Sequence, residues 1–191
     1  MSSATSSAPP SAAEISDAER SMLSIPGNAP PEAKASLARM MSAIFGIREG
    51  YREGFALDVA RRLRLLEVNV RGKEEEESRS EWKVVFETTV EPDMVNAGGS
   101  MHGGCSAYLV DICTSLALAA AGKPGTVSQA IDMVYHAPAP LGCRIRIVNL
   151  TITLGARVSS ARCEIWDTDN KRLIATGLHM KMAPSPAASK L

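Results

Sequence analysis

The chain has 191 residues, a length that suits one domain with terminal tails, and its 21 basic and 21 acidic residues give a formal net charge of zero. No basic patch of the kind that binds nucleic acid stands out, so we expect no nucleic-acid partner. No apolar segment reaches the roughly 18 uncharged residues that a membrane-spanning helix needs, so no membrane span is predicted.

The first 30 residues are rich in Ser, Ala and Pro, a composition that predicts a disordered lead. A mitochondrial transit peptide is rich in arginine and poor in acids, whereas the three acidic residues of this lead outnumber its single Arg20. We therefore expect three parts: a lead at 1–30, a folded domain at 31–182 and a flexible tail at 183–191.

Three helices are predicted along the chain. Apolar residues recur along one face from Pro31 to Ile44, which indicates an amphipathic helix, and a short second helix is predicted over 51–60. The run Cys105–Ala121 contains many good helix formers and no proline, and a Gly-Lys-Pro-Gly stop follows it. This run predicts one long, almost entirely apolar helix.

The other segments have the composition and alternation of strands. Those at 63–70 and 82–90 flank the acidic run 73–77, which we interpret as the solvated loop of a hairpin. Four more strands are predicted after the long helix, at 126–135, 144–154, 157–167 and 172–182. This order favours an α+β fold in which an antiparallel sheet of about five to six strands wraps around the long helix.

The segment Asn96-Ala-Gly-Gly-Ser-Met-His102-Gly103-Gly104 directly precedes the long helix. A helix that begins on glycine presents free N–H groups with partial positive charge, and such groups can stabilise a developing oxyanion. Asp111 follows inside the apolar helix, where a carboxylate is costly unless it is paired or put to use. These residues alone leave open whether Asp111 is a structurally paired buried acid or a functional group.

Gly103 and Asp111 are eight residues apart, so roughly 12 Å of helix rise separates them. One small reacting group can hardly touch both residues within one chain. If both act on the same carbonyl, the second must come from another copy of the chain. The spacing therefore indicates a site that is shared across a dimer.

The spacing of Asn96, His102-Gly103-Gly104, Asp111 and Ser128, with Tyr135-His-Ala-Pro downstream, resembles that of hotdog-fold acyl-CoA thioesterases. The resemblance is to the phenylacetate-degradation (PaaI-like) and thioesterase-superfamily-member-2 types, and it covers roughly residues 50–182. It implies a hotdog fold, a homodimer or homotetramer, and hydrolysis of an acyl-CoA to free acid and CoA without a cofactor.

The resemblance also implies a role for each matched residue. The Gly103 N–H would polarise the thioester carbonyl, and Asp111 would act as general base on water or as nucleophile. Asn96 would help to hold the water or the carbonyl, Ser128 would orient the water, and His102 would have a positioning role. Asp111 and Ser128 of one subunit would face Asn96 and Gly103 of the other.

Taken singly, these residues also have purely structural interpretations. Asn96 can be a turn residue, Ser128 an ordinary strand serine and His102 a helix-start residue bonded to backbone.

Two other functions fit the same pattern less well. A hotdog hydratase or dehydratase of enoyl-thioesters would use an Asp/His pair, but His102 adjoins the glycines and no second suitable histidine is expected nearby. A non-catalytic acyl-CoA-binding protein would keep the fold and lose the acid, whereas Asp111 is present.

The histidines and cysteines give no sign of a metal site. The three histidines are widely spaced, and the four cysteines form no C-x-x-C pair, so we expect free thiols, no metal and no cofactor. Cys105 lies close to the helix start, where a thiolate can be stabilised, but we interpret it as a small packing residue.

The chain ends in Ser189-Lys190-Leu191, after a Pro/Ala/Ser-rich tail. Ser-Lys-Leu at a free C-terminus is the peroxisomal address that an import receptor reads. A tail of this composition is expected to be extended and accessible. We therefore expect a peroxisomal import receptor as a partner and the peroxisome as the location.

Overall fold

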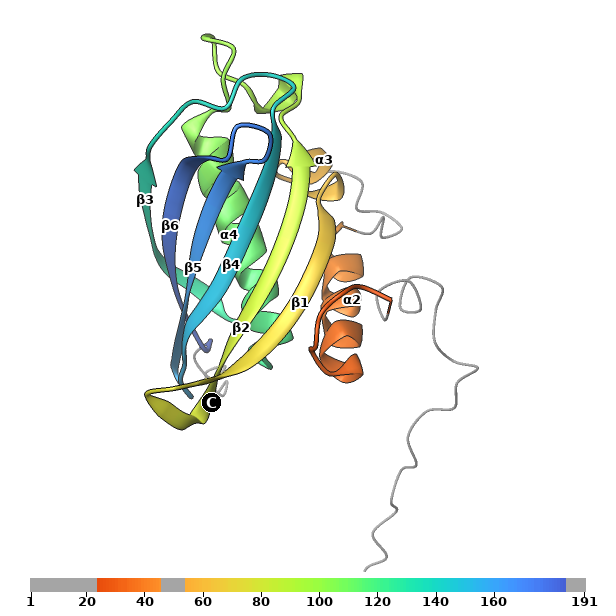
Figure 1. The fold of residues 1–191 in the computed structure, drawn as a ribbon, viewed down its shortest axis with the longest axis vertical. Coiled ribbons are helices and arrows are strands. Elements are labelled where there is room, and N and C mark those ends of the chain that lie inside the picture. Colours follow the sequence, from red (N-terminus) through yellow and green to blue (C-terminus); the bar gives the residue numbers. More distant parts are fainter. Residues whose placement is uncertain (1–23, 46–53, 185–191) are drawn as a thin grey trace, which may run out of the picture.

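The computed structural model describes residues 24–45 and 54–184. Its helices are α2 (Pro31–Phe45), α3 (Leu57–Arg61) and α4 (Gly103–Ala120), with a 3-10 turn at Pro92–Met94. Its strands are β1 (Arg64–Lys73), β2 (Glu76–Thr89), β3 (Val127–Tyr135), β4 (Arg144–Leu154), β5 (Val158–Asp167) and β6 (Arg172–Met182). The six strands form one antiparallel sheet in the order β1-β2-β4-β5-β6-β3, and α4 lies across one face of it (Figure 1). The predicted α+β hotdog architecture is confirmed.

Local differences from the predicted elements have identifiable causes. α4 begins at Gly103 rather than at Cys105, because the Nδ1 atom of His102 accepts a hydrogen bond from the Gly104 N–H at 2.9 Å and caps the helix. The hairpin turn is shorter than the acidic run, because β1 continues to Lys73 and β2 begins at Glu76. Of the predicted helix at 51–60, residues 51–53 lie outside the described residues, and only α3 is helical.

α4 is apolar on nearly all sides because it packs between the sheet and α2. Its buried residues include Leu109, Val110 and Leu116. Gly177 of β6 permits this close packing, since a Cβ atom at that position would lie only 2.7 Å from Val110 Cγ1. Within the described residues, α4 is the one helix that is long and apolar enough to cross a membrane. Its burial against the sheet accounts for this apolar composition.

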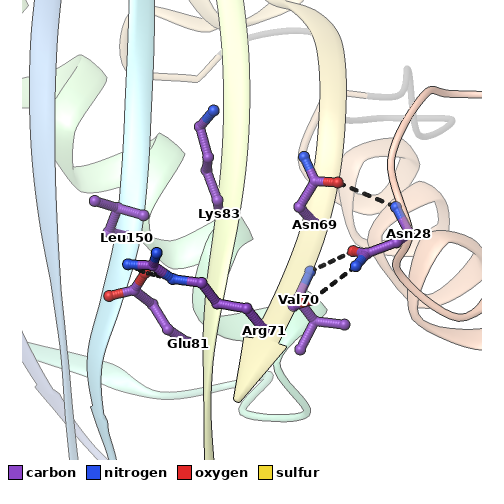
Figure 2. A pocket seen from close by; sticks show the side chains of 7 residues that line it. All are labelled: Asn28, Asn69, Val70, Arg71, Glu81, Lys83 and Leu150. Atoms are coloured by element: carbon purple, nitrogen blue, oxygen red, sulfur yellow. Dashed lines mark hydrogen bonds and ion pairs between the residues drawn. The ribbon is translucent and has the colours of Figure 1, made fainter. Parts of the chain in front are cut away.

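The two edges of the sheet differ. Residues 24–30, which the composition assigned to the disordered lead, lie along the outer edge of β1 and bond to it (Figure 2). Val68 N–H donates to the Pro26 carbonyl, and Val70 N–H donates to Asn28 Oδ1 at 2.8 Å. β3 pairs with β6 on one side only, and most of its residues are exposed. Among the described strands, β3 therefore presents the open edge of the sheet.

Several expectations fall outside the described residues. They concern the lead at 1–23, most of the tail at 183–191, and the Ser189-Lys190-Leu191 signal, since the description ends at residue 184.

Candidate active site

The start of α4 presents a free backbone donor, as the sequence predicts. Among the hydrogen bonds of the described residues, none has the Gly103 N–H as its donor, while the Gly103 carbonyl accepts one from the Tyr135 hydroxyl at 3.0 Å. A Cβ atom at position 103 would lie 3.3 Å from the Tyr135 ring, so glycine lets this strand residue close over the helix start. His102 caps the helix, which is the structural role that the sequence left open as an alternative.

Asn96 lies in the exposed loop before α4 and shapes that loop. Its Oδ1 atom accepts from the Gly98 N–H at 2.8 Å, and its own N–H donates to the Ser100 carbonyl at 2.8 Å. This is the turn role that the sequence allowed. The Asn96 Nδ2 group donates no hydrogen bond to any described residue.

The Asp111 carboxylate faces away from the apolar core. Its side chain is 42% exposed, so the interpretation of Asp111 as a buried acid is wrong for the single chain. Oδ1 lies 3.3 Å from Ser128 Oγ, 3.6 Å from His179 Nε2 and 3.9 Å from Lys181 Nζ. An exposed carboxylate with one weakly held oxygen is accessible to water and to a ligand.

Ser128, from the open strand β3, joins Asp111 to two residues of β6 that the sequence reasoning did not select. Ser128 Oγ lies 3.0 Å from His179 Nε2 and accepts from Lys181 Nζ at 3.1 Å. Both β6 side chains are buried, at 0% and 5% exposure. The expectation that no second histidine lies near the acid is wrong, because β6 runs beside β3 and directs His179 toward α4.

A signal for these two residues is present in the sequence. Leu178 and Met180 are 40% and 41% exposed, whereas their neighbours His179 and Lys181 are buried. This reverses the usual alternation of a strand covered on one face, where apolar residues face the core. Polar residues on the inner face of a strand are costly unless they bond to one another, so this pattern indicates a buried polar network.

Burial lowers the pKa of both basic groups in this network. Burial is the main cause that lowers the pKa of His179 from 6.5 to about 4; the charge of Lys181 adds to it and the charge of Asp111 opposes it. Burial also lowers the pKa of Lys181, and Asp111 opposes that shift.

The low pKa of His179 predicts a specific loss of stability in acid. Between pH 6.5 and 4 the unfolded chain binds a proton at His179 that the folded chain does not, so the free energy of unfolding falls as the pH drops through this range. We expect His179→Gln to remove a slope of up to about 1.4 kcal/mol per pH unit. Urea unfolding of both proteins at several pH values measures this slope.

The control for that experiment is His136→Gln, since the His136 ring is exposed and bonds only to the Thr176 hydroxyl among the described residues. It should keep the wild-type pH slope. Equal slopes in wild type and His179→Gln would contradict the prediction.

The structure thus places the predicted residues in two groups. Asp111 and Ser128 form one with His179 and Lys181, and the helix start with Gly103 and the Asn96 loop forms the other. About 12 Å of helix rise separates Gly103 from Asp111. The single chain does not bring the two groups together on one small ligand.

Two other features belong to neither group. Burial raises the pKa of the Cys105 thiol to about 11, and Cys105 packs against the core, so its interpretation as a packing residue is confirmed. An open pocket of about 350 Å³ lies on the other face of the sheet, across β1, β2 and β4 (Figure 2). Its charged side chains include Arg71 and Glu81, which pair with each other.

Comparison with known proteins identifies the family. Residues 98–174, which include Gly103, Asp111 and Ser128, match the family model described as the thioesterase superfamily. Acyl-coenzyme A thioesterase 13 from Homo sapiens is 36% identical over 101 residues, which are 52% of this chain and 71% of that protein. The chain belongs to the thioesterase superfamily. The Mus musculus thioesterase 13 is 34% identical over the same length.

Solved structures agree with this assignment. This thioesterase resembles zebra fish thioesterase superfamily member 2 with a TM-score of 0.61 and 26% identity, over 76% of this chain and 94% of that one. The Mus musculus member 2 gives a TM-score of 0.59 and 27% identity, over 76% and 93%. The phenylacetic acid degradation protein PaaI from Thermus thermophilus shares the fold, with a TM-score of 0.51 and 21% identity. The family makes the chain a thioester hydrolase.

Proposed function

We propose that this chain hydrolyses an acyl-CoA to a free acid and CoA, at two equivalent sites that two copies of the chain build together. The observation that carries the proposal is the pairing of a water-accessible carboxylate, Asp111, with the Ser128 hydroxyl at 3.3 Å. Relatives named acyl-coenzyme A thioesterase support the substrate class.

In the proposed reaction, the Gly103 N–H and the Asn96 Nδ2 group of one copy bond the thioester carbonyl oxygen. Asp111 of the other copy removes a proton from a water molecule as the water oxygen attacks the carbonyl carbon. The carbon–sulfur bond then breaks, and the CoA sulfur leaves as a thiolate that takes up a proton. The partial positive charge of the α4 N-terminus stabilises the negative charge that develops on the carbonyl oxygen.

The two edges of the sheet support the shared site. The β1 edge is occupied by residues 24–30, whereas β3 has one unpaired edge with exposed Val134 and Tyr135. Ser128 lies on β3, and Tyr135 of β3 covers Gly103. A second copy that pairs along β3 would therefore lie beside both halves of the site, and we propose a homodimer at this edge.

The hydratase alternative is not favoured, although His179 lies near Asp111. Both ring nitrogens of His179 are bonded inside the protein, to Thr114 and Ser128, and the ring is fully buried. A hydratase needs a histidine that can exchange a proton with a substrate carbon, and a buried, doubly engaged ring cannot reach one.

The test is a direct assay of the purified protein with acyl-CoA thioesters of short, medium, long and aryl type. A thiol reagent should detect free CoA from at least one of them. Loss of the conjugated absorbance of an enoyl-CoA without free CoA would support hydration instead. Tight acyl-CoA binding with no turnover of any thioester would support a binding protein and contradict the proposal.

We also propose that a chain ending at Leu191 is imported into peroxisomes through Ser189-Lys190-Leu191. Residues 182–191 fused to a fluorescent reporter should send it to peroxisomes, and the same fusion without the last three residues should stay in the cytosol. The full chain without those three residues should hydrolyse its substrate normally in vitro. A reporter that carries residues 182–191 and stays diffuse in cells with working import would contradict this proposal.

A further inference from the structure

The hydrogen bonds behind Asp111 determine where the proton of His179 lies. Thr114 Oγ1 is 2.6 Å from the Val110 carbonyl oxygen and 2.6 Å from His179 Nδ1. Two oxygens at 2.6 Å need a proton between them, and a carbonyl has none to give, so the Thr114 hydroxyl donates to Val110. The Thr114 oxygen must then accept, and the donor is the N–H at Nδ1 of His179.

The same reasoning determines where the proton of the Ser128 hydroxyl lies. Burial keeps the pKa of His179 at about 4, so at neutral pH the ring is uncharged and carries one proton. Because that proton is on Nδ1, Nε2 is an acceptor. Its partner is Ser128 Oγ at 3.0 Å, so the Ser128 hydroxyl donates to His179.

Lys181 completes the environment of the Ser128 oxygen. Its Nζ atom donates to Ser115 Oγ at 2.8 Å and to Ser128 Oγ at 3.1 Å. Two acceptors compete for the single Ser128 proton, His179 Nε2 at 3.0 Å and Asp111 Oδ1 at 3.3 Å. The shorter contact and the need of Nε2 for a donor direct the proton to His179, which leaves none between Ser128 Oγ and Asp111 Oδ1. Two neighbouring acceptor oxygens of this kind favour a molecule that donates two protons, which is water.

We propose that His179 is a positioning residue that turns the Ser128 proton away from Asp111, so that Ser128 and Asp111 together accept both protons of the attacking water. A water molecule held in this way has its lone pairs free for the thioester carbon. As its oxygen bonds to that carbon, the proton facing Asp111 transfers to the carboxylate. This inference rests on the proposed acyl-CoA hydrolysis.

The surroundings of His179 contain few other groups that could move its proton. Among the described residues, the charged groups facing it are Asp111 from α4 and Lys181 from β6. β3 contributes the Ser128 hydroxyl, and β5 places Ala161 opposite His179 in the sheet. The proton position therefore depends on Thr114 and Ser128.

A double-mutant cycle tests the positioning role. His179→Leu removes the acceptor, and we expect it to lower kcat about 10- to 100-fold with little change in KM, as loss of an orienting partner commonly does. His179→Gln keeps a carbonyl acceptor within reach of Ser128 and should retain most of the activity. In a Ser128→Ala background, His179→Leu should cost less than about twofold more, because residues that act as one unit are not additive. If His179→Leu lowers kcat by the same factor in the Ser128→Ala background as in the wild type, and the variants are folded, the role of His179 is merely structural.

A measurement that needs no activity separates this inference from the proposed function. Nitrogen NMR shifts of the His179 ring at neutral pH should show the tautomer protonated at Nδ1, and Thr114→Val should shift the ring away from it. A ring protonated at Nε2, or at both nitrogens, would overturn the inference even in an active enzyme. Absence of CoA release by the wild type would overturn the proposed function, and with it the role of His179 in holding the attacking water. The NMR result would still decide where the His179 proton lies.

Discussion

Replacing Asp111 by Ala or Asn should lower kcat by several hundredfold or more while the protein stays folded. Loss of a general base alone commonly costs about 10²–10⁴-fold. The fold should tolerate the change, because the Asp111 side chain is 42% exposed and its neighbour Lys181 keeps its bonds to Ser115 and Ser128. Release of free CoA under saturating substrate measures the effect, and thermal unfolding checks the fold.

Asp58→Asn is the matched control, since Asp58 is an exposed acid on the helix α3, with a side chain 77% exposed. It should leave turnover unchanged. Near-normal turnover in folded Asp111→Ala would exclude Asp111 as the base and, with it, the proposed mechanism.

Two inactive variants should restore activity when their subunits exchange. In a mixed dimer of Asn96→Ala with Asp111→Ala, one site receives both altered residues and the other receives the intact Asn96 and the intact Asp111. Random exchange of equal amounts should give about half mixed dimers with one working site each, hence roughly a quarter of wild-type activity. This is a large gain over two nearly inactive parents.

The exchange itself must be verified by native mass spectrometry of subunits with different tags. Mixing Asp111→Ala with Ser128→Ala is the matched control, because both residues lie in the same half of the site, and neither site of that mixed dimer is intact. Confirmed mixed dimers of Asn96→Ala and Asp111→Ala with no gain in activity would contradict a shared site.

The sequence was sufficient for the elements because their signals are local. The apolar run after Gly103 and the alternating strands 144–154 and 172–182 appear within a few residues of where they were predicted. The strand order was not predictable in this way, because β3 pairs with β6 although β4 and β5 lie between these two strands in the sequence. Such a pairing is non-local and leaves no mark in the local pattern.

The site was predicted in part. Asp111 and Ser128 are 17 residues apart in sequence, and the structure brings them together as the motif spacing implied. The role of His179 was not predicted, because His179 lies 51 residues beyond Ser128 and their contact depends on the crossover that places β6 beside β3. The exposure of Asp111 was not predicted either, because the apolar character of a helix does not reveal which of its sides the sheet leaves uncovered.

The short segment that precedes α2 has a consequence for how many copies can join. A sheet with two free edges can add strands at both ends, and repeated addition builds an open fibre. Here Pro26 and Asn28 already occupy the hydrogen-bonding groups of Val68 and Val70. Edge-to-edge growth along this sheet must therefore stop after one pairing at β3. The seven residues 24–30 ahead of α2 thereby cover the edge at which a further strand could add.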